Sequence, residues 1–221
     1  MKTEHIRPQD IEKRSFEIIS EELDQMQREG KLSDVSAFSE VETPVVKRCI
    51  HTTADFDYAS TLRFSGDAVK AFAALIRQGA TVVTDTNMAL SGINKIELAK
   101  YGCDIKCYMA DEEVGKEAKE RELTRAGVSM EKAMKIDGPV IFVVGNAPTA
   151  LMTLKEAYDK GTYIPAFIIG VPVGFVNVVA AKELILESDI PYIVNSGRKG
   201  GSNVAAAIVN AMLYAMRDGK L

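Results

Sequence analysis

The 221-residue sequence predicts a three-layer α/β fold, in which helices cover both faces of a mostly parallel sheet. From about residue 66, short continuous apolar runs alternate with longer stretches of helical period. Such runs are typical of strands buried on both faces, and their alternation with helices predicts right-handed crossovers. No linker, repeat or low-complexity stretch is visible, so we expect a single domain spanning residues 1–221.

An N-terminal helix precedes this pattern, and we expect it to pack onto the sheet domain. Between Pro8 and about Gly30, apolar residues such as Phe16, Ile19 and Leu23 keep a helical period, and Gly30 ends it. Residues 31–45 are typical of a surface connection with a short helical turn.

The regular part of the chain predicts helices and strands in alternation. Each predicted strand is an apolar run bounded by glycine, proline or polar residues. The predicted helices span residues 67–78, 88–100, 114–135, 148–160, 175–186 and 203–216, and the predicted strands span 80–85, 104–110, 139–145, 166–171 and 191–197.

Composition narrows the class of protein. Hydrophobic residues make up 47% and charged residues 26%, which is typical of a folded domain with a substantial core. The net charge of −4 argues against a general nucleic-acid binder, which needs basic surface to displace counterions. The charged start of the sequence lacks a signal-peptide pattern and no apolar run is long enough to span a membrane, so we expect a cytoplasmic protein.

Parallel sheets bind ligands at the carboxyl ends of their strands, and four predicted strands end in turn-rich polar loops. They begin at Asp85, Gly145, Val171 and Ser196. The last contains GRKGGS, residues 197–202, where flexible backbone, two cations and a helix N-terminus favour an anion. Its glycine spacing does not match a P-loop, and the stretch is also compatible with a surface turn.

Few residues offer catalytic chemistry. The carboxylate-rich runs are typical of solvated helix faces, and no nucleophile elbow or metal-binding cluster is present. Cys103 and Cys107 have a spacing that favours core packing over a metal site. The chain has two histidines, and His51 lies in VVKRCIHTTADFDY, between a short apolar run and a hydroxyl-rich loop. It is either a buried, hydrogen-bonded histidine or a group that exchanges a proton near neutral pH. These residues are suited to a reaction that needs one proton donor and a firmly positioned substrate, without a cofactor or a metal.

These motifs together resemble the precorrin-8X methylmutase family, also called precorrin isomerase or cobalt-precorrin-8 methylmutase. The resemblance covers nearly the whole chain in order, and it depends on several segments at once. They are IEKRSFEII, KRCIHTTADFDY, VVTDTNMALSGI, TRAG, GNAPTAL, GVPVGFVNV and GRKGGSNVAAAIVNA. The sequence departs from the family at Ala180 and Ala181, where the family often has Glu-Ser before a lysine.

The resemblance implies an isomerase of cobalamin biosynthesis, which moves a methyl group from C-11 to C-12 of a ring-contracted tetrapyrrole. It implies that His51 is the general acid, and that the active protein is a homodimer with shared active sites. We expect Arg125, Arg198 and Lys199 to meet substrate carboxylates. The expected substrate-binding residues are Ser15, Thr52, Thr53, Asp85, Thr86, Met88, Arg125, Asn146, Pro172, Phe175, Arg198, Lys199 and Gly200.

Other interpretations of these residues stay open from sequence alone. The hydroxyls are equally suited to capping helices and turns, and Met88 and Phe175 to ordinary core positions. At the level of function, a tetrapyrrole carrier without catalysis is the main alternative. A second alternative is a nucleotide-binding enzyme that uses GRKGGS as a phosphate loop.

Overall fold

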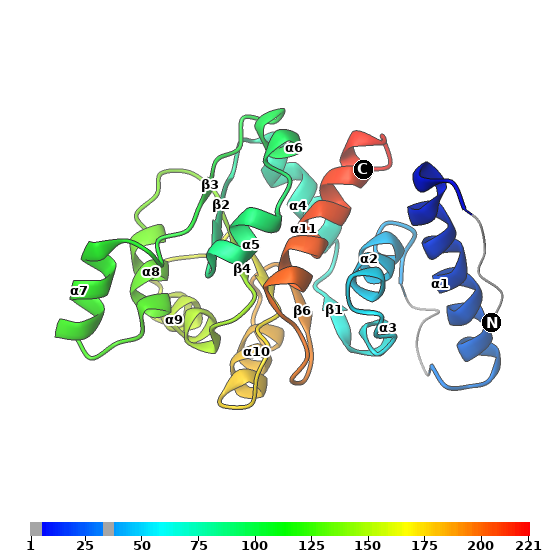
Figure 1. Ribbon diagram of the computed structural model, residues 1–221. Coiled ribbons are helices and arrows are strands. Elements are labelled where there is room, and N and C mark those ends of the chain that lie inside the picture. The colour runs from blue at the N-terminus through cyan, green and yellow to red at the C-terminus, as the bar shows by residue number, and fades with distance from the viewer. Residues whose placement is uncertain (1–5, 33–37) are drawn as a thin grey trace.

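The computed structural model describes residues 6–32 and 38–221, and its elements follow one another as Figure 1 shows. The strands are β1 (Leu62–Phe64), β2 (Thr81–Thr84), β3 (Ile105–Lys106), β4 (Val140–Val144), β5 (Phe167–Gly170) and β6 (Tyr192–Asn195). The helices are η1 (Pro8–Asp10), α1 (Ile11–Arg28), α2 (Thr43–Thr53), α3 (Tyr58–Thr61), α4 (Ala68–Arg77), α5 (Asn87–Gly92), α6 (Lys95–Ala99), α7 (Glu112–Glu120), α8 (Arg125–Ala133), α9 (Pro148–Asp159), α10 (Val178–Leu186) and α11 (Ser202–Arg217).

The described strands form one mostly parallel sheet in the order β1-β6-β5-β4-β2-β3. Strands β2 to β6 pair in parallel, with Val82 opposite Ile141 and Ile141 opposite Phe167. Strand β1 pairs antiparallel with β6 at the edge. The predicted α/β class is therefore confirmed, and the sequence prediction lacked helix α2, the short helix α3 and the three-residue edge strand β1.

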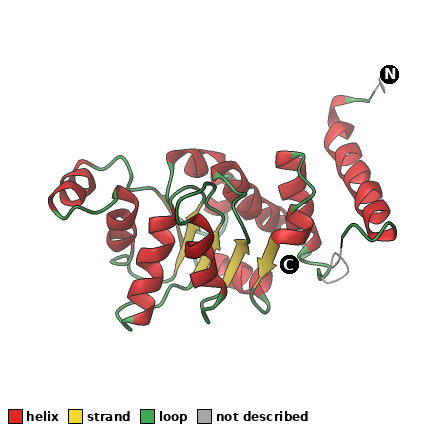
Figure 2. Cartoon of the chain, turned by 90° about the horizontal axis from the view of Figure 1, so that it is seen from below, coloured by secondary structure: helices red, strands yellow, loops and turns green. Residues whose placement is uncertain are grey.

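Alternating side chains of the central strands β2, β4, β5 and β6 enter two separate cores. Ile141 and Val143 of β4 face a core shared with α4 and α11, whereas Val140, Phe142 and Val144 face one shared with α8, α9 and α10. This alternation follows from the two-residue repeat of a strand. Figure 2 shows the strands enclosed between helices. Burial of all five β4 side chains explains why the strand is a continuous apolar run.

The N-terminal helices form an outer layer beside α11. Helix α2 packs along α11, and α1 packs on α2 at the edge of the molecule, as Figures 1 and 2 show. The whole VVKRCIHTT segment is part of α2, so Thr52 and Thr53, expected in a hydroxyl-rich loop after His51, belong to the helix. Residues 33–37 of the expected surface connection lie outside the described residues.

Two predicted helices are each split in two. The predicted helix 88–100 is interrupted where the side chain of Asn94 caps α6 by accepting from the amides of Ile96 and Glu97. The predicted helix 114–135 is interrupted at Glu122, which has a φ of 54°, and Thr124 then caps α8. In both cases the polar capping residue was the available sequence signal.

The two clustered cysteines flank the shortest strand. Cys103 is buried, with its thiol bonded to the carbonyl of Ile76 at 3.2 Å, and Cys107 is half-buried. Because β3 comprises two residues, the predicted strand 104–110 is much too long. Among the described residues, no helix is long and apolar enough to cross a membrane.

Candidate active site

Four loops lie at the carboxyl ends of β2, β4, β5 and β6, which we call the carboxyl edge. Asp85, after β2, is fully buried, and its two oxygens accept from the amides of Gly145, Asn146 and Ala147 at 2.7–2.8 Å. Burial raises the pKa of Asp85, and the three amide bonds oppose that rise. Asp85 therefore orders the loop after β4, and Asn146 is exposed on that loop.

The loops after β5 and β6 are joined by backbone bonds. The amide of Gly201 donates to Val171 at 2.9 Å, and that of Gly174 donates to Arg198 at 3.2 Å. A side chain at Gly200 would lie 2.1 Å from the carbonyl oxygen of Val171, so this position requires glycine. Thr86 caps α5 and bonds the hydroxyl of Ser202 at 2.7 Å, which joins the first loop to the last.

Two buried polar residues that the sequence did not reveal hold the loop after β6. Lys182 of α10 is fully buried, and its ammonium donates to the carbonyls of Gly197 and Lys199 at 2.8 Å. Asn195 also donates to Lys199, at 2.9 Å, and accepts from the hydroxyl of Thr61 at 2.7 Å. Burial lowers the pKa of Lys182 to about 8. A lone lysine in the apolar run VVAAKELIL was the available signal.

The family departure at residues 180 and 181 lies next to this lysine. Ala180 is exposed, and Ala181 is buried in the core between α10 and the sheet. The lysine that follows them in the family pattern is present as Lys182, which contacts the loop after β6.

His51 lies in the last turn of α2 and is exposed, which rules out the buried-histidine interpretation. Its imidazole stacks on Phe16 of α1, with ring centroids 5.1 Å apart and an interplanar angle of 18°. The guanidinium of Arg48 lies 4.6 Å from the Phe16 centroid and pairs with Glu12. The bond from Arg48 lowers the pKa of Glu12 against the effect of burial, and the charges of Arg48 and His51 add to the lowering.

The hydroxyls near His51 bond the backbone of their own helices. Ser15 donates to Ile11, Thr52 to Arg48 and Thr53 to Cys49, at 2.8–3.0 Å. In this arrangement each hydroxyl keeps acceptor capacity, so it suits a substrate N–H or O–H better than a carboxylate. Cys49, two residues before His51, is fully buried, and burial raises its pKa to about 12, so it is not a thiolate nucleophile.

Large apolar side chains are exposed at the carboxyl edge. Met88 is 69% exposed and Phe175 is 80% exposed, so neither is a core residue. The guanidinium of Arg198 lies 5.4 Å from the ring centroid of Phe175, which places one cation beside an apolar face. Pro172 is buried beneath this loop.

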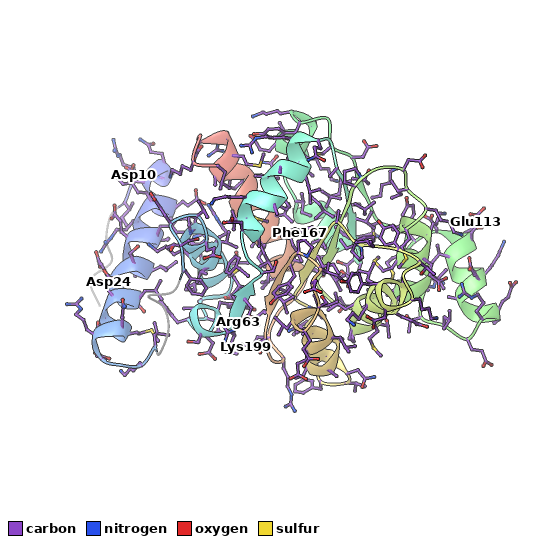
Figure 3. The ribbon with its side chains drawn as sticks, turned by 180° about the vertical axis from the view of Figure 1, so that it is seen from behind. Asp10, Asp24, Arg63, Glu113, Phe167 and Lys199 are labelled. Atoms are coloured by element: carbon purple, nitrogen blue, oxygen red, sulfur yellow. The ribbon has the colours of Figure 1, made fainter. Side chains whose placement is uncertain are left out.

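Within one chain, Arg125 lies far from His51. It is exposed at the start of α8, near the carbonyl of Met109 at 3.5 Å. Figure 1 shows α8 and α2 at opposite ends of the molecule, and Figure 3 shows the same separation between Asp10 beside α1 and Glu113 of α7, which packs on α8.

Two hollows lie near the residues described above, one beside α8 and one beside α2. A cavity of about 550 Å³ lies between α8 and α9 and includes Thr124 and Thr149 in its lining, but not His51. A hollow of about 390 Å³ between α2 and α11 is lined by Phe16, Arg48 and Tyr214, next to the histidine. In the part of the chain described here, no group of three or more His, Cys, Asp or Glu side chains is placed to hold a metal ion.

Lys199, the second cation of GRKGGS, is already paired. Its ammonium lies 2.6 Å from a carboxylate oxygen of Asp55 and 2.5 Å from one of Asp57. Both residues follow α2, so this contact joins the segment after His51 to the carboxyl edge. Figure 3 shows Lys199 at the lower edge of the molecule.

Comparisons with known proteins show the family to which this chain belongs. A family model described as precorrin-8X methylmutase matches residues 10–215. A protein of Salmonella typhimurium named cobalt-precorrin-8 methylmutase is 43% identical over 96% of this chain and 97% of its own length. One of Priestia megaterium with the same name is 42% identical over 94% of this chain and 88% of its own.

A solved structure shares both fold and sequence. The crystal structure of precorrin-8X methylmutase from Thermus thermophilus matches with a TM-score of 0.81 and 37% identity, over 96% of this chain and all of that one. The fold and these relatives therefore define an enzyme class, that of intramolecular methyl-shifting isomerases. The chain belongs to the precorrin-8X methylmutase family.

Proposed function

We propose that this protein moves a methyl group from C-11 to C-12 of precorrin-8X or its cobalt-containing counterpart, giving hydrogenobyrinate or cobyrinate for cobalamin biosynthesis. The observation that carries the proposal is the exposed imidazole of His51, held on Phe16 at the end of α2. His51 acts as general acid. It protonates the macrocycle, and the resulting electron deficiency promotes the methyl shift. General acid catalysis typically contributes ~10²–10⁴-fold, and immobilising the ring in a reactive shape adds to it.

The substrate is a flat apolar ring with many carboxylates, and the carboxyl edge offers matching groups. Met88 and Phe175 supply apolar surface, and Arg198 beside Phe175 supplies a cation with bidentate geometry. The loops that present these side chains are supported by Asp85, Thr86, Pro172 and Gly200. Asn146 is exposed beside them.

The working unit that we propose is a homodimer with shared active sites. Arg125 lies at the opposite end of the chain from Ser15 and His51, so one chain does not bring them to one ring. A second copy supplies Arg125 to the site, and it covers apolar side chains that one chain leaves exposed. We place the enzyme in the cytoplasm, where its three free cysteines stay reduced.

The visible spectrum distinguishes this enzyme from a carrier of tetrapyrroles. Incubation with the substrate should change the absorption spectrum over time and with turnover, because the methyl shift changes conjugation. A carrier binds the ring and releases the same isomer. Both substrate forms are tested, beginning with the cobalt form, since the Salmonella and Priestia relatives are named for it. If both forms are recovered as the unchanged isomer, the proposal is wrong.

A further inference from the structure

The segment that joins α2 to β1 is fastened to the loop after β6 at two points. Lys199 bonds Asp55 and Asp57, which follow His51 by four and six residues. Thr61, at the end of the same segment, donates to Asn195, and its carbonyl accepts from the amide of Ser196 at 2.8 Å. The end of the helix that carries His51 is thus tied to the carboxyl edge.

Hydrogen bonds and close packing hold the backbone of Lys199 in place, so its side chain extends from an ordered loop. The carbonyl of Lys199 accepts from both Lys182 and Asn195, and Gly200 next to it packs against Val171 with no room for a side chain. A cation on a rigid loop holds its partners in place better than one on a mobile loop, because less freedom is lost in forming the contact.

The partners of Lys199 are also ordered. The amide of Asp57 bonds the Asp55 carboxylate at 3.0 Å, and the amide of Asp55 approaches the hydroxyl of Thr53, the last residue of α2, at 3.3 Å. The bonds from Asp55 and Asp57 raise the pKa of Lys199. Burial raises the pKa of Asp55, but the bonds from Lys199 and the Asp57 amide outweigh it and the net direction is downward.

We propose that Lys199 is a positioning residue, which with Asp55 and Asp57 forms a latch that holds the end of α2, and with it His51, at the carboxyl edge. This replaces the expectation that Lys199 binds a substrate carboxylate, since two carboxylates of the chain already occupy its ammonium. Arg198 remains the cation of this loop that faces substrate. The inference rests on the proposed role of His51.

Steady-state kinetics with a double-mutant cycle test the latch. We compare Lys199→Met, the pair Asp55→Asn with Asp57→Asn, and all three changes together. Asparagine keeps the oxygen that accepts from the Asp57 amide. Each variant should lose about 10- to 100-fold in kcat, because a small misplacement of a catalytic group costs that much, while KM stays within about twofold. The triple variant should lose no more than either partner change, because both break the same contact.

A readout without turnover separates the latch from the role of His51. The chain has two histidines, so a His5→Gln background leaves one imidazole, and its NMR signals report His51 directly. Lys199→Met and the aspartate pair should shift or broaden those signals in the same way. If His51→Ala keeps full activity, the proposed function fails, whereas unchanged imidazole signals in the latch variants overturn the latch alone.

Lys155→Met is the matched control, because Lys155 pairs with both oxygens of Asp159 in α9. It should leave kcat, KM and the imidazole signals unchanged. Because exposed ion pairs contribute little to stability, the latch variants should melt within about 5 °C of the natural protein. If Lys199→Met raises KM and the aspartate pair does not, Lys199 binds substrate and the latch is wrong. Additive losses in kcat also overturn it.

Discussion

At the residue scale, the contact between His51 and Phe16 brings two distant segments together at the proposed proton donor. The rings are nearly parallel, and the guanidinium of Arg48, which pairs with Glu12, lies over the Phe16 ring. Aromatic pairs of this kind are worth ~0.5–1.5 kcal/mol beyond burial, so the stack orients the imidazole without contributing much to global stability.

Phe16→Leu should therefore lower kcat by about 2- to 10-fold, the rate equivalent of the stacking energy. Phe16→Tyr keeps the aromatic face and should retain most of the rate. Steady-state kinetics check both, with circular dichroism as the control for folding. Equal losses in the leucine and tyrosine variants would show that the stack does not matter.

At the scale of elements, helix α10 controls the loop after β6 through one buried ammonium. Lys182 has no acidic partner among its described contacts, and it donates to two backbone carbonyls. A neutral amine still has two N–H donors, so the same bonds persist when the group loses its proton. Burial disfavours the charged form, so the folded state favours the neutral amine, and the pKa of Lys182 is lowered to about 8 from 10.5.

This shift predicts a stability that depends on pH. Between about pH 8 and 10.5 the unfolded chain binds one more proton at Lys182 than the folded chain, so the free energy of unfolding rises with pH. Relative to Lys182→Met, the natural protein should gain up to about 1.4 kcal/mol per pH unit in that window. Urea unfolding of both proteins at several pH values gives the difference between their free energies of unfolding. Taking this difference removes the contributions of groups that the two proteins share. A constant difference across the window contradicts the assignment.

The elements themselves were largely predictable from sequence, for reasons particular to each. Strand β4 is buried on both faces, so its apolar run predicts it, and Pro148 marks the first turn of α9. Strand β1 was not predictable, because its three residues are defined by pairing with β6, more than a hundred residues later. Helix α2 was not predicted, because Thr52 and Thr53 favour loops locally and bond their own helix when α2 packs on α11.

The candidate site was predictable in its residue types but less so in its contacts. The carboxyl ends of the strands indicated the four loops, since parallel topology brings them to one edge. Sequence did not reveal that Lys199 pairs with Asp55 and Asp57, because that contact spans more than 140 residues. It also did not reveal Lys182, whose role depends on burial beneath a loop.

At the scale of the whole molecule, the separation of Arg125 from His51 is the observation behind the homodimer that we propose. The two residues lie on α8 and α2, at opposite ends of the chain in Figure 1. In the homodimer that we propose, each end of one chain meets the other end of its partner, and twofold symmetry then gives two equivalent sites.

Subunit mixing tests this arrangement. His51→Ala and Arg125→Ala should each be inactive alone, whereas a mixed dimer contains one site in which both residues are intact. Co-expression at equal levels should recover about one quarter of the natural activity, since half of the dimers are mixed and each has one complete site. Failure to recover activity, in dimers shown by mass spectrometry to be mixed, contradicts shared sites.

The central claim is that His51 donates the proton that drives the methyl shift. The most direct test is the rate of the spectral change with His51→Ala, measured alongside the affinity for the macrocycle. The account predicts that turnover falls by ~10²–10⁴-fold or more while the fold and the binding of the macrocycle persist. A His51→Ala protein that converts its substrate at the natural rate would contradict the account.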